Sequence, residues 1–181
     1  MDNMTREDRL RETSPLWRSS FRAESPDRAF VAEINPAWEI SMGSPTYGTL
    51  CLSAGLHLDR CSPAFLWSAD SRFLAVPRFV HSFWRGIRQH LLVADLVERR
   101  LYQSASLAPY LQPDSFVDGR LTVIQNPHRR RPSTLSWQIP AALSSQFTRP
   151  FAMWSVGTDG HPTPACSRPA PPPADSSRSA A

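Results

Sequence analysis

The sequence predicts a mainly β protein: an antiparallel sheet of blade-like hairpins, forming an open sheet, a sandwich or a partial propeller, between disordered ends. Short apolar runs rich in aromatic and β-branched residues alternate with turn residues. The 181 residues include 18 prolines, which helix interiors tolerate poorly. Both ends are polar or proline-rich, unlike the apolar middle. We therefore expect a disordered or frayed segment over residues 1–14, a β domain over residues 15–155, and a disordered tail rich in Pro, Ser and Ala over residues 156–181.

The clearest hairpin lies over residues 64–76. An apolar run ends at Trp67, a polar break surrounds Asp70, and a second apolar run begins at Phe73. Serine and aspartate side chains in such a break bond nearby backbone amides and stabilise a turn. We therefore expect largely buried arms, with Trp67 on one, Phe73 on the other and Asp70 in the turn.

Further strands are expected where apolar residues alternate or cluster between turn signals, at residues 37–42, 47–52, 89–96, 101–103 and 134–139. In the last of these, Leu135, Trp137 and Ile139 share one face. The spacing of apolar residues over 78–88 fits one face of a short helix, although a long aromatic loop fits equally well.

A repeated phrase links the first half of the domain to the central hairpin. Ser-x-Asp-x-x-Phe-apolar-Ala begins at Ser25 and again at Ser68, 43 residues later, and residues 117–123 give a weaker echo. With the apolar strand that ends in Asp95, this phrase resembles the inner hairpins of WD-repeat-like β-propellers, whose repeats span about 40–45 residues. The resemblance covers about residues 15–125.

This resemblance implies blade-like hairpins, but closed propellers need at least about four blades. Two and a half repeats do not close a ring alone. Either the chain oligomerises, or it is a fragment, or its hairpins form an open sheet or sandwich. Similar hairpins arising independently in an antiparallel sheet are the alternative.

Composition excludes some functions and constrains the compartment. All 20 basic residues are arginine, so neither a phosphate loop with lysine nor a Schiff-base lysine is possible. A GC-rich, bacterial-like genome explains this usage, and the net charge of +4 is modest. Cys51, Cys61 and Cys166 have no metal-ligand spacing and suggest reduced thiols. Without a signal peptide or an apolar run of about 18 residues, we expect a cytoplasmic protein outside the membrane.

The sequence contains no recognisable catalytic motif. No nucleophile elbow or dinucleotide loop occurs, and the five histidines lack metal-ligand spacing, so we expect neither a metal nor a cofactor. Asp27 and Asp70 are interpreted as turn caps. We expect a non-catalytic protein-interaction module, and an enzyme whose site forms only in three dimensions is an alternative.

The candidate contact residues are Phe79, Phe83 and Trp84, immediately after the central hairpin. Exposed together, they form a contact patch for a protein partner, because tryptophan is enriched at interface centres. Folded inward, they are core. We expect Phe79 in the core and Trp84 partly exposed. The partner is an unidentified protein, with a homo-oligomer as a further possibility.

A nucleic-acid interface is the second alternative. Arg129, Arg130 and Arg131 form the only basic cluster, and Trp137 nearby could stack on a base. The cluster also suits a solvated loop. In the tail, Pro171–Pro173 favours polyproline II, as in ligands of aromatic-groove domains, but we expect a tail without function.

Overall fold

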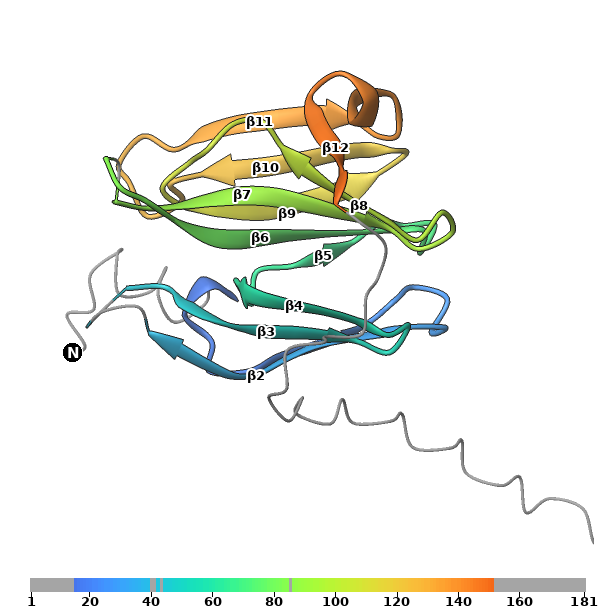
Figure 1. Ribbon diagram of the computed structural model, residues 1–181, viewed down its shortest axis with the longest axis horizontal. Helices are drawn as coiled ribbons and strands as arrows, with labels where there is room; N and C mark the ends of the chain where they lie inside the picture. Colours follow the sequence, from blue (N-terminus) through green and yellow to red (C-terminus); the bar gives the residue numbers. More distant parts are fainter. Residues whose placement is uncertain (1–14, 40–41, 43, 85, 152–181) are drawn as a thin grey trace, which may run out of the picture.

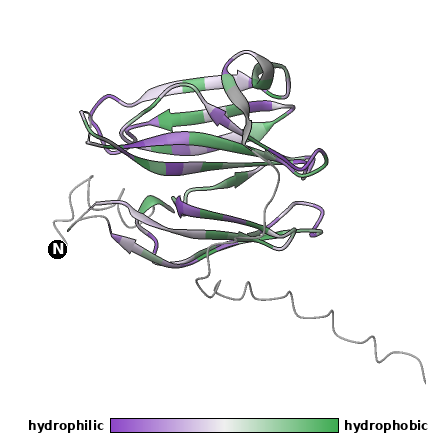
Figure 2. Ribbon diagram, viewed as in Figure 1, coloured by the Kyte–Doolittle hydropathy of each residue, from purple (hydrophilic) through white to green (hydrophobic). Residues whose placement is uncertain are grey.

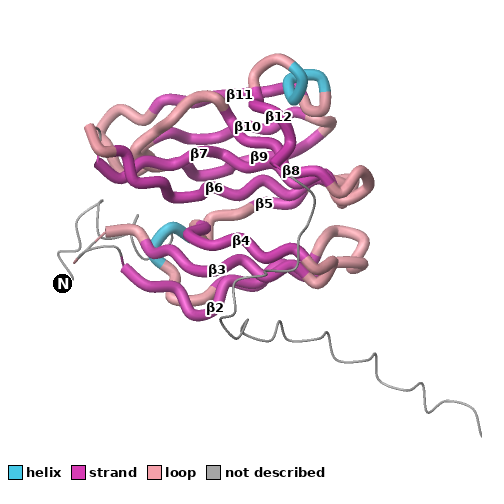
Figure 3. Tube along the Cα trace, viewed as in Figure 1, coloured by secondary structure: helices cyan, strands magenta, loops and turns pink. Residues whose placement is uncertain are grey.

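The computed structural model describes residues 15–39, 42, 44–84 and 86–151, and strands dominate them (Figure 3). Two 3-10 helices are present in these residues, at Pro15–Trp17 and Ala141–Ser144. The strands are β1 (Phe21–Glu24), β2 (Val31–Glu39), β3 (Thr46–Leu52), β4 (Leu56–Cys61), β5 (Leu66–Trp67), β6 (Phe73–Ser82), β7 (Gly86–Asp95), β8 (Arg100–Ser104), β9 (Leu111–Val117), β10 (Arg120–Gln125), β11 (Ser133–Gln138) and β12 (Phe147–Phe151). The mainly β, antiparallel prediction is confirmed. The ends predicted to be disordered lie outside the described residues.

The strands form three stacked layers (Figure 1). The first contains β1–β4, the second β5–β8 with β12 beside β8, and the third the order β11-β10-β9. A single antiparallel pair, Cys61 with Arg78, joins β4 to β6, so the first two layers are halves of one folded-over sheet. The third layer packs on the second through contacts of β9 with β5, β6 and β7.

The central layer is buried on both faces because alternate side chains of a strand point to opposite sides. Leu74 and Leu92 join the core between the first and second layers. Their neighbours Phe73 and Leu91 join the core between the second and third. Green hydrophobic segments occur on the strands of all three layers, interrupted by white and purple ones, and many of the turns are purple (Figure 2).

The predicted central hairpin is present. Leu66 pairs with Ala75 and Trp67 with Leu74, while Asp70 lies in the turn between the arms. Trp67 and Phe73 are both buried, as expected. Strands also occupy most of the predicted ranges 47–52, 89–96, 101–103 and 134–139, and β2 covers the first three residues of the range 37–42.

The helix considered for residues 78–88 is wrong. Strand β6 continues to Ser82 and β7 begins at Gly86, and the two pair without a break from Phe73↔Asp95 to Ser82↔Gly86. This ladder satisfies the backbone N–H and C=O groups that a helix would satisfy internally. Helix-like spacing over this stretch therefore reflects a hairpin with a solvent-exposed aromatic tip.

The repeated phrase forms the same turn twice. In each copy the serine hydroxyl donates to the aspartate carboxylate and accepts the phenylalanine amide, from Phe30 N to Ser25 Oγ (3.0 Å) and from Phe73 N to Ser68 Oγ (2.8 Å). The residue after each aspartate has positive φ, 62° at Arg28 and 61° at Ser71. The weaker echo differs, because Asp118 and Gly119 make a tight two-residue turn between β9 and β10.

Candidate functional site

The tip of the β6–β7 hairpin presents two aromatic side chains to solvent. Phe83 is 87% exposed and Trp84 is 89% exposed, and their rings meet edge to face with centroids 5.1 Å apart. The long ladder beneath them holds the tip on a rigid scaffold. Trp84 is more exposed than expected, since only partial exposure was predicted for it.

Phe79 is the exception among the three predicted contact residues. It is only 4% exposed, and its ring meets that of Tyr47 edge to face at 6.1 Å. The expectation that Phe79 belongs to the interior is confirmed. Phe79 therefore packs beneath the exposed surface at this end of the molecule and does not itself form part of the exposed aromatic pair.

Next to the tip lies a groove that crosses several strands. One cavity, of about 300 Å³, is lined by Tyr47, Arg60, Phe79, Val80, His81 and Ile87. A second, of about 340 Å³, is lined by Asn35, Pro36, Trp38, Tyr47, Gly48, Thr49, Asp59 and Arg60. Tyr47 and Arg60 line both cavities, so the two lie next to each other. We call this combined feature the aromatic groove.

Local features of β2 and β3 shape the floor of the groove. The ladder between them is irregular between Ile34 and Ala37, and Gly48 faces this irregularity. A Cβ on Gly48 would lie 2.6 Å from the Pro36 carbonyl oxygen, so only glycine fits here. Beyond the irregularity, Trp38 pairs directly with Tyr47 and is 65% exposed. The exposed indole thus forms one wall of the groove.

The basic loop joins β10 to β11. Arg129, Arg130 and Arg131 are exposed, as expected for a solvated loop. Trp137 is only 8% exposed, and its ring packs edge to face on Phe147 at 5.8 Å in the core beneath the third layer. The indole is therefore unavailable to stack on a base, which corrects the expectation that included it.

Other rings lie beside this loop. His128 meets Tyr110 with centroids 4.9 Å apart and Trp17 with centroids 6.2 Å apart. All three side chains are partly exposed. Sequence inspection missed this cluster because Trp17 and Tyr110 are far from the loop in the chain.

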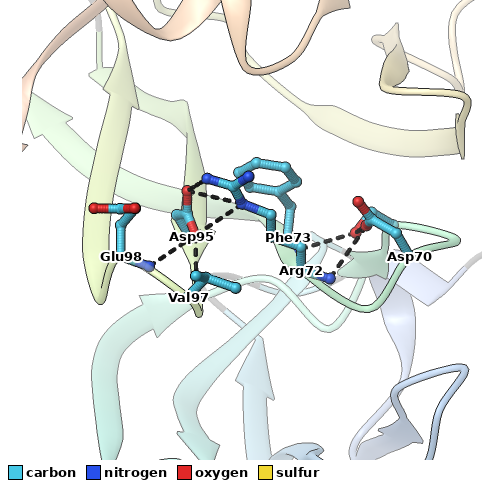
Figure 4. A network of polar contacts seen from close by, with 7 residues as sticks. Asp70, Arg72, Phe73, Asp95, Val97 and Glu98 are labelled. Carbon is cyan, nitrogen blue, oxygen red and sulfur yellow. Dashed lines mark hydrogen bonds and ion pairs between the residues drawn. The ribbon is translucent and has the colours of Figure 1, made fainter.

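Carboxylates at the opposite end of the molecule have structural partners. Asp95 is almost fully buried and accepts three hydrogen bonds from the Arg72 guanidinium, the shortest 2.7 Å. It also accepts the amides of Val97 and Glu98 (Figure 4). These hydrogen bonds with Asp95 raise the pKa of Arg72. Asp70 accepts the Arg72 amide, which supports its interpretation as a turn cap.

Asp27 has the same role in the first copy of the turn. The Ser25 hydroxyl and the Ala29 amide donate to its carboxylate and lower its pKa. A cavity of about 340 Å³ at this end is lined by residues that include Asp70 and Asp118 but no histidine. None of these three cavities, taken singly, is lined by both a carboxylate and a histidine.

Neither Cys51 nor Cys61 forms a disulfide in the described part of the chain. Cys51 Sγ lies 3.5 Å from His57 Nδ1 on the outer face of the first layer. Cys61 is fully buried, and burial raises the pKa of its thiol to about 12. No group of three or more His, Cys, Asp or Glu residues in the described ranges could hold a metal ion. None of the helices there is long and apolar enough to span a membrane.

The predicted strands over residues 37–42 and 47–52 contain two groove residues, Trp38 and Tyr47. Their predicted bounds would pair Trp38 with Cys51, whereas in the structure Trp38 pairs with Tyr47. No local pattern indicates that Arg60, from β4, and Phe79, from β6, complete the same surface, because these strands meet through a single pair.

Comparison with models of known protein families, with curated proteins and with solved structures found no match. The function of the chain must therefore be argued from its geometry.

Proposed function

We propose that this chain is a non-catalytic protein-interaction module whose contact surface is the aromatic end formed by Phe83, Trp84 and the adjacent groove. The observation that carries the proposal is the exposure of two neighbouring aromatic rings on a rigid hairpin tip. Large exposed apolar side chains that gather at one place are a mark of interaction sites. Tryptophan in particular supplies much of the binding energy at interfaces.

A photo-crosslinking amino acid at position 84 tests this proposal, with the same amino acid at Val97 as control. Val97 is also exposed and apolar, but it lies in the β7–β8 turn at the opposite end. We expect a specific protein adduct from position 84 and none from position 97. The purified partner should then bind the double variant Phe83→Ser/Trp84→Ser at least about 30-fold more weakly, since hot-spot losses exceed about 2 kcal/mol.

The matched control is Val97→Ser/Val117→Ser, which removes two exposed apolar side chains at the opposite end. It should bind like the parent. Equal affinity of the Phe83→Ser/Trp84→Ser variant and the parent would show that the aromatic end is not the contact surface.

Nucleic-acid binding is the second candidate function, favoured by the exposure of Arg129–131 beside the partly exposed rings of Trp17 and Tyr110. Arginines contact phosphates, and aromatic rings stack on bases. Anisotropy of single- and double-stranded probes at low salt tests it. Replacing the three arginines by Ala should lower affinity and flatten its salt dependence. Replacing Arg28, Arg99 and Arg100, which are exposed elsewhere, changes the net charge equally and should have less effect.

We further propose that the hairpins are units similar to WD-repeat-like blades, arranged as an open stack. The recurrence of one turn at an offset of 43 residues supports this relation. The copies also touch, since the Asp27 amide donates to Ser71 Oγ at 3.0 Å. Cys51 and Cys61, which form no disulfide among the described residues, support a reducing compartment such as the cytoplasm.

A further inference from the structure

We propose that the aromatic groove binds a polyproline II segment and that its occupant is the proline-rich stretch Arg168–Asp175 of this same chain. This inference rests on the interaction function proposed above and names the chemistry of the ligand. Proline-rich segments bind grooves lined by aromatic rings, because their extended helix is preformed and loses little entropy on binding.

The walls of the groove have the chemistry that such a segment needs. Trp38 and Tyr47 provide flat rings on which proline rings can pack. A polyproline II helix makes no internal hydrogen bonds, so its carbonyl oxygens need outside donors. Arg60 lines both cavities and has no hydrogen bond or ion pair among the described residues, which leaves its guanidinium available as that donor.

The width of the groove matches the length of the proline-rich segment. The groove residues Trp38, Tyr47, Arg60 and Phe79 lie on the successive strands β2, β3, β4 and β6. Three strand spacings measure about 14 Å. The five residues Pro169–Pro173, of which four are proline, span about 15 Å in polyproline II geometry. One such segment therefore crosses the groove from the first wall to the last.

The chain after β12 is long enough for the proline-rich segment to reach the groove. Phe151 pairs with Leu101, which pairs with Ala94. Ile87, on the groove, lies seven residues from Ala94 along β7, or about 23 Å. Crossing from β12 to β3 adds five strand spacings, about 24 Å. The 17 residues 152–168 can extend over about 56 Å, which exceeds both distances added together.

A spin label on Cys166 tests the proposal in the full chain, because this cysteine lies three residues before Pro169. Cys51→Ala removes one competing thiol, and the buried thiol of Cys61 does not react near neutral pH, since its pKa is about 12. We expect the amide signals of groove residues such as Gly48 and Val80 to lose most of their intensity. Signals of Ser136, in the third layer, should keep theirs.

Two variants establish the cause. Replacing Pro169, Pro171, Pro172 and Pro173 by Ser keeps the tether length but removes the ligand, and should restore the groove signals. Trp38→Ser should restore them as well, whereas Val117→Ser, an exposed site at the opposite end, should not. Amide shifts elsewhere in each variant report whether the fold is intact.

The occupant is tested by mixing isotope-labelled protein that lacks Cys166 with unlabelled, spin-labelled protein. Broadening within one molecule but not in the mixture supports the tail of the same chain. Broadening in the mixture would assign the groove to the tail of a second copy and overturn the proposed occupant. Groove signals that never broaden, or that stay broadened in the proline variant, would overturn the proposal. Crosslinking from position 84 is read independently, so either proposal can fail alone.

Discussion

Trp67 connects the first and second layers through both its apolar ring and its indole N–H. Its ring is buried in the core between the first and second layers, and its Nε1 donates to the Ala23 carbonyl at 3.3 Å. Buried indoles usually need such a partner for the N–H. Asp70, three residues later, is exposed and bonds only within its own turn. The two residues should therefore differ greatly in their importance for stability.

We predict that Trp67→Ala lowers the free energy of unfolding by about 3–5 kcal/mol, while Asp70→Ala lowers it by about 1 kcal/mol. Trp84→Ala deletes the same atoms at an exposed site and should change stability by less than about 0.5 kcal/mol. Urea unfolding followed by circular dichroism measures all three. If Trp67→Ala unfolds like Trp84→Ala, the central hairpin does not support the core. If Asp70→Ala abolishes partner binding without changing stability, its carboxylate is functional rather than a cap.

Cys61 makes stability depend on pH in the alkaline range. Its pKa rises from an ordinary value of 9.0 to about 12 in the folded protein because the thiolate would be buried. Below pH 9 both states keep the proton, so the thiol adds no pH dependence. Between pH 9 and 12 only the unfolded state loses it, and stability falls by up to about 1.4 kcal/mol per pH unit.

The free energy of unfolding should thus fall more steeply from roughly pH 8 to pH 10.5 in the parent than in Cys61→Ala. All other residues are the same in the two proteins, so their contributions cancel in the comparison. Parallel pH profiles would show that the thiol is not protected from ionisation.

At the scale of elements, the Arg72–Asp95 pair joins the β5–β6 turn to the β7–β8 turn (Figure 4). The Arg72 guanidinium also lies 4.8 Å from the Phe73 ring centroid, over its face. Asp95 is buried, whereas Arg72 is about one-third exposed. The two substitutions should therefore differ in their cost to stability. Removing Arg72 leaves the Asp95 carboxylate buried without its ionic partner, whereas removing the Asp95 charge leaves a guanidinium that water can still reach.

We predict that Arg72→Met, which keeps an apolar stem, destabilises the fold by about 1.5–3 kcal/mol. Asp95→Asn keeps an acceptor for the turn amides and should cost less. The double variant should be more stable than the sum of the two single effects indicates, by at least about 0.5 kcal/mol. Thermal or urea unfolding of the four proteins measures this coupling. Strict additivity would mean that the pair contributes nothing beyond the separate contacts.

At the scale of the whole molecule, the two outer faces of the stack carry mainly polar side chains, apart from Trp38 and Tyr47 of the aromatic groove on the first layer. On the first layer, Arg22 faces Glu33 and Thr49 donates to Asp59. On the third, the row Ser115, Thr122 and Ser136 crosses β9, β10 and β11. A layer that stacked on further blades would need apolar side chains on its outer face. The terminal units of repeat proteins, in contrast, carry a polar outer face.

We therefore predict that the chain does not assemble into a closed ring. Light scattering after size exclusion should give the mass of one chain, 20.3 kDa. A mass several times larger would support ring closure by oligomerisation. If a dimer appears, the Phe83→Ser/Trp84→Ser variant tests whether it forms through the aromatic end. A dimer that forms there should be lost in the variant.

Local chemistry in the sequence was sufficient for several of the strands and for the repeated turn. Side chains of Ser25, Asp27, Ser68 and Asp70 bond backbone within a few residues, so the turn they form depends little on distant chain. Alternation likewise placed Leu135, Trp137 and Ile139 on one face of their strand. These interactions are short in sequence, which is why their pattern can be recognised there.

Tertiary structure decided what depends on segments far apart in the chain. The pairing of β6 with β7 turned a helix-like spacing into a hairpin with Phe83 and Trp84 at its tip. Packing against Phe147 buried Trp137 and removed it from the basic loop. Strands β2, β3, β4 and β6 together built the aromatic groove, because layers stack to bury their apolar faces and thereby bring distant residues to one end.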